Sequence, residues 1–195
     1  MRCPIVVILA VTAAWAPVMT MTAAAAPRTS VTVRVYQTAD LPLALEQRAL
    51  AVAGAVLREA RVDVHWRQCG ARSSAAFCIE PPESSELLLR IARQGITRKK
   101  PFILGEALVF GRCNGGVLAS VYADRVAALA DEAEADAAVL LGRVAAHELA
   151  HLMMRTSVRH ARHGLMRPNW TPAEVRRSRA LDWMFTKDDV AAIHR

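Results

Sequence analysis

The sequence predicts one α+β domain in which a twisted sheet, with mostly antiparallel edges, packs on two helices and is followed by a helical C-terminal part. Three observations predict it. Residues 31–36, VTVRVY, alternate as a half-buried strand does. Residues 41–61 carry apolar side chains at helical spacing. Residues 135–154 are rich in Ala, Leu and Met, which favours a second, largely buried helix.

The chain begins with a predicted signal peptide, residues 1–25. Arg2 gives a basic start, residues 4–19 are apolar, and Ala23 and Ala25 form a small-residue cleavage site. We therefore expect an exported protein, secreted or periplasmic, whose domain occupies residues 26–195. No later segment is apolar enough for a stable membrane span. The sequence gives no indication of the oligomeric state.

The elements of the first half follow from local patterns. The 41–61 helix turns one apolar face inward, made of Leu45, Ala49, Val52, Val56 and Leu57. Further strands are expected at 62–66 and 87–91, then a hairpin of strands 107–110 and 117–122 joined by residues 111–116. His65 falls on the second strand, where we interpret it as an ordinary strand histidine. Residues 117–122 are our candidate for an exposed edge that could bind an extended peptide.

Cysteine usage fits an oxidising compartment. After loss of the signal peptide, Cys69, Cys78 and Cys113 remain. Cys69 and Cys78 bracket a loop rich in Ser, Ala and Pro, and we expect them to pair. Cys113 is then the third, unpaired cysteine, which is either free and buried or part of a different disulfide.

The net charge of +7 comes almost entirely from arginine. It is compatible with acidic substrates or an anionic surface, but Ala and Arg are abundant throughout, and we favour this simple compositional explanation. Nucleic acid is not expected as a partner, because aromatic residues make up only 5% of the chain and the protein is predicted to be exported.

The chemistry is concentrated in His147-Glu148-Leu149-Ala150-His151, an H-E-x-x-H motif within the 135–154 helix. Histidines four residues apart lie on one helix face, so both imidazoles can reach one metal ion. Glu148 lies on the same turn, where its carboxylate can act on a water at the metal. The motif predicts a zinc (Zn²⁺) site with His147 and His151 as ligands and Glu148 as general base. A catalytic zinc site usually has three protein ligands, so a third must lie elsewhere.

The segment after the motif resembles the metzincin group of zinc metalloproteases. The pentad is followed by a short loop carrying His160 and His163, then Gly164-Leu165-Met166. This resemblance implies a small zincin domain, a third histidine ligand and a Met turn beneath the metal, with Met166 as the Met-turn residue. The metzincin pattern places Gly and His where this chain has Met154 and Ser157, so the loop is longer and lacks its glycine.

The chain is still more similar to a group of small exported bacterial proteins with an HExGH helix, a His-Ser pair, Gly-Ile-Met and a Trp, here Trp170. In that group the third histidine precedes the Gly by four residues. The resemblance therefore implies His160 as third ligand, with His163 as the alternative.

The helical C-terminal part follows from capping signals. Thr171, Pro172 and Glu174 are typical of a helix start, so we expect a helix from Thr171 to about residue 180. A gluzincin-like role for Glu174 as zinc ligand ranks below this capping role. Thr186 and Asp189 predict the cap of a last helix.

These observations predict an exported zinc metallopeptidase acting on peptides or proteins. The alternatives are a non-catalytic metal-binding or interaction protein on a zincin scaffold and, less favoured, a hydrolase of non-peptide amides.

Overall fold

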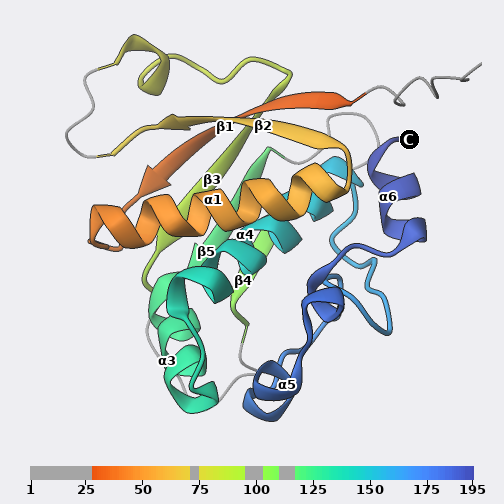
Figure 1. Ribbon diagram of the computed structural model, residues 1–195. Helices are drawn as coiled ribbons and strands as arrows, with labels where there is room; N and C mark the ends of the chain where they lie inside the picture. The colour runs from red at the N-terminus through yellow and green to blue at the C-terminus, as the bar shows by residue number, and fades with distance from the viewer. Residues whose placement is uncertain (1–27, 71–74, 95–102, 110–116) are drawn as a thin grey trace, which may run out of the picture.

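The computed structural model describes residues 28–70, 75–94, 103–109 and 117–195. The predicted signal peptide, Phe110 and Cys113 lie outside the described residues. Twelve elements span the described part (Figure 1). They are β1 (Thr29–Gln37), α1 (Leu43–Glu59), β2 (Val62–Gln68), η1 (Ala76–Cys78), β3 (Glu86–Ala92), β4 (Gly105–Leu108), β5 (Leu118–Tyr122), α3 (Ala123–Ala133), α4 (Ala137–Met153), α5 (Pro172–Arg177), η2 (Ala180–Trp183) and α6 (Lys187–Ile193).

The five strands form one sheet in the order β2-β1-β3-β5-β4. Strands β2, β1, β3 and β5 are parallel to one another, and β4 pairs antiparallel with β5. The predicted α+β class is confirmed, with antiparallel pairing confined to the β4 edge. The predicted hairpin partners do pair, although the first strand begins earlier, at Gly105.

The predicted edge strand was wrong. Residues 118–122 pair with β3 on one side and with β4 on the other, so β5 lies inside the sheet. The edge strand on this side is β4, Gly105–Leu108. Sequence could not decide this, because a hairpin does not reveal which of its strands joins the rest of the sheet.

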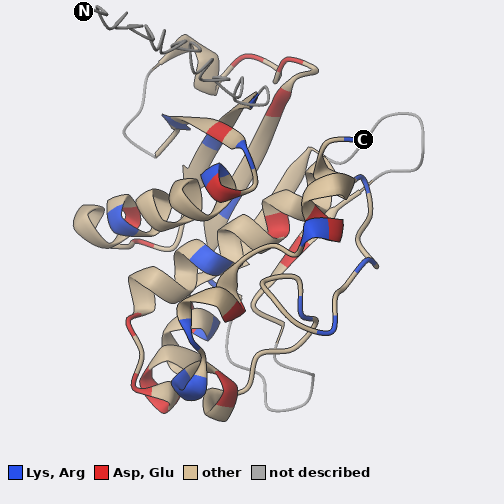
Figure 2. Cartoon of the chain, turned by 45° about the vertical axis from the view of Figure 1, so that its right-hand side comes forward, with Lys and Arg blue, Asp and Glu red and all other residues tan. Residues whose placement is uncertain are grey.

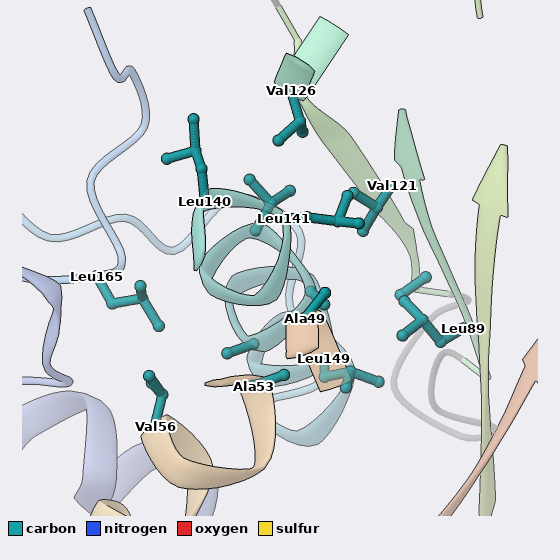
Figure 3. Packing of buried hydrophobic residues seen from close by; sticks show 14 of the residues in the cluster. Ala49, Ala53, Val56, Leu89, Val121, Val126, Leu140, Leu141, Leu149 and Leu165 are labelled. Atoms are coloured by element: carbon teal, nitrogen blue, oxygen red, sulfur yellow. The ribbon is translucent and has the colours of Figure 1, made fainter. Parts of the chain in front are cut away.

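Helices α1 and α4 lie side by side on one face of the sheet (Figure 1). Gly142 in α4 makes the close approach possible, since a Cβ there would lie 2.4 Å from Ala49 O and 2.8 Å from Val52 Cβ. In Figure 3, Leu89 and Val121 of the sheet lie on one side of α4, and Leu165 of the C-terminal segment lies on the other. Helix α4 is therefore central to the core, as its apolar sequence predicts.

A helix that the sequence analysis did not predict, α3, precedes α4. The sequence pattern predicts a single helix in this region, over residues 135–154. Glu134 instead adopts a left-handed backbone, with φ 52°, and ends α3. Asp136 then caps α4 by accepting hydrogen bonds from the backbone N–H groups of Ala138 and Val139.

The C-terminal part is helical, as predicted. Thr171 and Glu174 form a reciprocal capping box at α5, with Pro172 at the first position. Thr186 and Asp189 form the same arrangement at α6. The first of these helices is shorter than expected and ends at Arg177.

The predicted disulfide between Cys69 and Cys78 is present, with the two Cα atoms 5.4 Å apart. Basic and acidic side chains are interspersed over many elements, in keeping with the compositional explanation of the net charge (Figure 2). No described helix has the length and apolar character that a membrane span requires.

Candidate metal centre

Three histidines converge beside the C-terminal half of α4. One ring nitrogen from each of His147, His151 and His160 lies within 4.8 Å of the others. His147 and His151 are buried on one face of α4, and His160 approaches from the loop that follows the helix and is exposed. The ring centroid of His160 lies 5.6 Å from that of His147 and 4.9 Å from that of His151. In the part of the chain that the structure describes, this is the one such cluster found.

Backbone carbonyls fix the orientation of the two helical imidazoles. Nδ1 of His147 lies 2.9 Å from Leu165 O, and Nδ1 of His151 lies 2.8 Å from Thr156 O. A carbonyl oxygen can only accept, so each Nδ1 carries the proton and donates it. Each neutral ring then presents an unprotonated Nε2.

These two Nε2 atoms face each other at 3.1 Å. With both Nδ1 atoms protonated, neither Nε2 has a proton to share, so two lone pairs confront each other. Burial lowers the pKa of His147 to about 3 and that of His151 to about 4, which keeps both rings neutral. A shared cation removes the conflict: two nitrogens on one tetrahedral zinc lie ~3.3 Å apart. The donor set therefore fits a zinc ion.

Glu148 lies next to this cluster in a largely apolar setting. The residue is 7% exposed, and burial raises its pKa to about 8, with a further contribution from the nearby carboxylate of Glu106. A cation close by would lower this pKa again. Gly105 on β4 leaves the space that Glu148 occupies, because a Cβ at Gly105 would lie 2.8 Å from Glu148 Oε1 and 2.7 Å from Ser120 O.

The cluster opens into a cavity of about 330 Å³. Its walls come from β4, α4 and the segment after α4. The residues that line it are Ile103, Leu104, Gly105, Glu106, Ala107, Val144, His147, Glu148, His151, Ser157, His160, Arg167, Pro168, Asn169 and Trp170. The three histidines and Glu148 therefore share one cavity with residues of the edge strand β4.

The other residues named from sequence have clear positions. His163 is exposed and outside the histidine cluster. Gly164 has φ +80°, a conformation that favours glycine. Met166 is fully buried, and its carbonyl accepts a hydrogen bond from Ala161 N at 2.8 Å. His65 is exposed on β2, the opposite edge of the sheet. The Glu174 carboxylate is bound by Thr171 in the capping box.

Sequence reasoning missed several residues of the site. Gly105 and Glu106 come from a four-residue strand with no distinctive local pattern. Tyr122 donates to Glu106 Oε1 at 2.6 Å, and this contact depends on the β4–β5 register. Arg167 is one of many arginines in the region. Its proximity to Gly164-Leu165-Met166 was the single signal that could have singled it out.

Comparison with solved structures agrees with this architecture. The chain is similar in fold to archaemetzincin. The crystal structure of that protein from Methanopyrus kandleri aligns with a TM-score of 0.50 and 19% sequence identity, covering 87% of this chain and 97% of that chain. No protein-family model matches the sequence, and no curated protein matches it. At this identity the likeness shows the fold alone: an α+β domain similar in fold to that of archaemetzincin.

Proposed function

We propose that the protein is an exported zinc-dependent metallopeptidase. The observation that carries the proposal is the convergence of His147, His151 and His160 beside the buried Glu148, in a cavity bordered by an edge strand. The archaemetzincin-like fold supports it. Export rests on the predicted signal peptide.

In this proposal the three histidines would hold the metal through ring nitrogens. A bound zinc ion supplies a Lewis acid that polarises a carbonyl and lowers the pKa of water to about 7. Glu148 accepts a proton from the attacking water and passes it to the departing amine. The carbonyls of Leu165 and Thr156 keep His147 and His151 in the tautomer that presents Nε2.

The substrate in this proposal is an extended peptide or protein segment. Strand β4 pairs with β5 on one side, and no described strand pairs with its other side. Its backbone N–H and C=O groups can therefore add a peptide as a further strand. Since Gly105, Glu106 and Ala107 line the cavity, a peptide bound there would pass next to Glu148.

Replacement of Glu148 by Ala tests the proposal. We expect Glu148→Ala to retain zinc and to lose turnover by at least about 100-fold, because a general base typically contributes 10²–10⁴. Zinc content is measured by elemental analysis, and cleavage of a peptide library by mass spectrometry, with and without chelator. The control is Glu132→Ala, which removes an exposed carboxylate on α3.

The same experiment separates the peptidase from a non-catalytic metal-binding protein. A protein that only binds metal would show no chelator-sensitive cleavage in the wild type. Glu148→Ala would then change nothing, and the peptidase proposal would be rejected.

A further inference from the structure

Arg167 is a cation in the wall of the cavity with unmet hydrogen-bonding capacity. Its Nε and Nη2 atoms are closed off from solvent and have no hydrogen-bond partner within the described residues. Buried polar groups are nearly always paired, and an unpaired buried donor of a charged group is costly. Arg167 as a whole lines the cavity, and the described chain supplies no hydrogen-bond acceptor for its guanidinium.

No carboxylate of the described chain fills this role. None lies within ion-pair distance of Arg167 among the residues that the structure places. Glu174 is near enough for Arg167 to contribute to the lowering of its pKa, but the larger causes are its hydrogen bonds from Thr171. Glu174 Oε2 accepts from both the backbone N and the hydroxyl of Thr171, each at 2.8 Å.

The guanidinium lies over Trp183, which is linked to the histidine cluster through Trp170. Arg167 Cζ lies 5.3 Å from the ring centroid of Trp183. Trp183 meets Trp170 edge-on, with centroids 4.8 Å apart, and Trp170 meets the His147 ring edge-on at 5.8 Å. A cation stacked on a buried ring is already oriented before a ligand arrives, which reduces the entropy cost of binding.

We propose that Arg167 is a specificity-determining residue that binds a carboxylate of the substrate in the cavity. The inference rests on the proposed peptidase function and names its substrate class: peptides with an acidic side chain or a free C-terminal carboxylate at this position. Arginine suits the task because its guanidinium is always charged, and a charge-assisted hydrogen bond to a carboxylate is stronger than a neutral one.

Peptide binding to the Glu148→Ala variant tests the proposal without turnover. Three probes are titrated, and binding is followed by the tryptophan fluorescence of the protein. They are acetyl-Ala-Glu-Ala-amide, its neutral isostere acetyl-Ala-Gln-Ala-amide, and acetyl-Ala-Ala-Ala with a free C-terminal carboxylate. We expect at least one carboxylate probe to bind about tenfold or more tighter than the Gln peptide. The carboxylate probe that binds more tightly than the Gln peptide shows whether the bound carboxylate is a side chain or a C-terminus.

A second substitution tests the assignment to Arg167. Arg167→Met in the same background should abolish the preference for the carboxylate probe over the Gln peptide. Arg143→Met is the matched control, because Arg143 stacks on the same Trp183 ring, with Cζ 4.3 Å from its centroid, but does not line the cavity. It should retain the preference. Circular dichroism and zinc content report the integrity of each variant.

The outcomes are distinguishable. Equal affinity for all three probes, undetectable binding included, would overturn the proposal, and so would a preference that survives Arg167→Met. Hydrolysis by the wild type without carboxylate preference would leave the peptidase standing and reject the role of Arg167. Preference without hydrolysis would leave the anion subsite standing and reject the peptidase.

Discussion

Gly105 determines where the Glu148 carboxylate can lie. In Gly105→Ala the new Cβ would meet Ser120 O at 2.7 Å and Glu148 Cγ at 2.8 Å. The contact with the Ser120 backbone oxygen requires β4 to shift against β5, and the contact with Glu148 requires its flexible side chain to move. Since small misplacements of a reacting group can cost up to about 100-fold, we expect kcat/KM on a cleaved peptide to fall tenfold or more with zinc retained.

Gly70→Ala is the matched control, because a Cβ at Gly70 meets nothing within 4 Å. It should leave both turnover and thermal stability unchanged. Full turnover by Gly105→Ala would show that the position of Glu148 does not depend on this glycine.

His160 and His163 can be separated by zinc affinity. His160 lies in the histidine cluster and His163 is exposed outside it. Loss of a ligand should cost more than the 10–100-fold typical of losing a residue that merely supports a ligand. We therefore expect His160→Ala to weaken zinc binding by more than about 100-fold in a chelator competition titration, and His163→Ala to leave it unchanged. The reverse result would make His163 the ligand.

Individual site residues could be predicted from the sequence where they lie close together in the chain. His147, Glu148 and His151 share one helix face, so their spacing alone predicts their proximity. His160 was predicted as a ligand from the resemblance to other proteins, because residues 154–165 show no sequence periodicity from which the path of the loop could be predicted. Gly105 and Arg167 depend on contacts between segments far apart in the chain, which no local pattern encodes.

Gly142 controls the contact between α1 and α4. An alanine Cβ there would meet Ala49 O at 2.4 Å and Val52 Cβ at 2.8 Å, so the helices would have to separate. Overpacking of this kind costs about 1–3 kcal/mol. We expect Gly142→Ala to lower the free energy of unfolding by that amount in a denaturant titration.

Gly54→Ala, in α1, provides the opposite case. Its Cβ would meet Trp66 Nε1 at 3.4 Å, an ordinary contact. Alanine favours a helix interior over glycine by up to about 1 kcal/mol, so this variant should be neutral or more stable. Equal destabilisation of both variants would contradict close packing at Gly142.

The elements themselves were predictable where a pattern spans the whole segment. The sequence of β1 alternates between apolar and polar residues, and the sequences of α1 and α4 carry long apolar stripes. Helix α3 was missed because its boundary with α4 depends on the left-handed backbone at Glu134, a non-glycine residue. The neighbours of β5 depend on the strand order, which tertiary pairing determines.

A buried ion-pair network joins three adjacent strands. Arg34 on β1 and Arg67 on β2 both donate to the Glu86 carboxylate on β3, and Glu83 N donates to it at 2.9 Å. The guanidinium of Arg34 is the largest cause that holds the pKa of Glu86 below its usual value. Breaking a buried pair is strongly destabilising. We therefore expect Glu86→Gln to lower Tm at pH 7 by roughly 5–15 °C.

The effect of Glu86→Gln should depend on pH in a defined direction. With a folded-state pKa below that of the unfolded chain, the carboxylate contributes its stability above the unfolded pKa, about 4.3. The contribution is lost as pH falls through the folded-state pKa. The difference in Tm between wild type and variant should therefore shrink below about pH 4. An equal difference at pH 3 and pH 7 would contradict this role.

The two carbonyls that hold His147 and His151 belong to Leu165 and Thr156, in the same stretch that supplies His160. A nascent chain that has emerged from the ribosome only as far as α4 already contains the motif, yet its imidazoles can still take either tautomer. The centre is completed when this later stretch docks, with Leu165 N bound to Met184 O. In the proposed peptidase, hydrolysis would therefore require residues that follow the H-E-x-x-H motif in the chain as well as the motif itself.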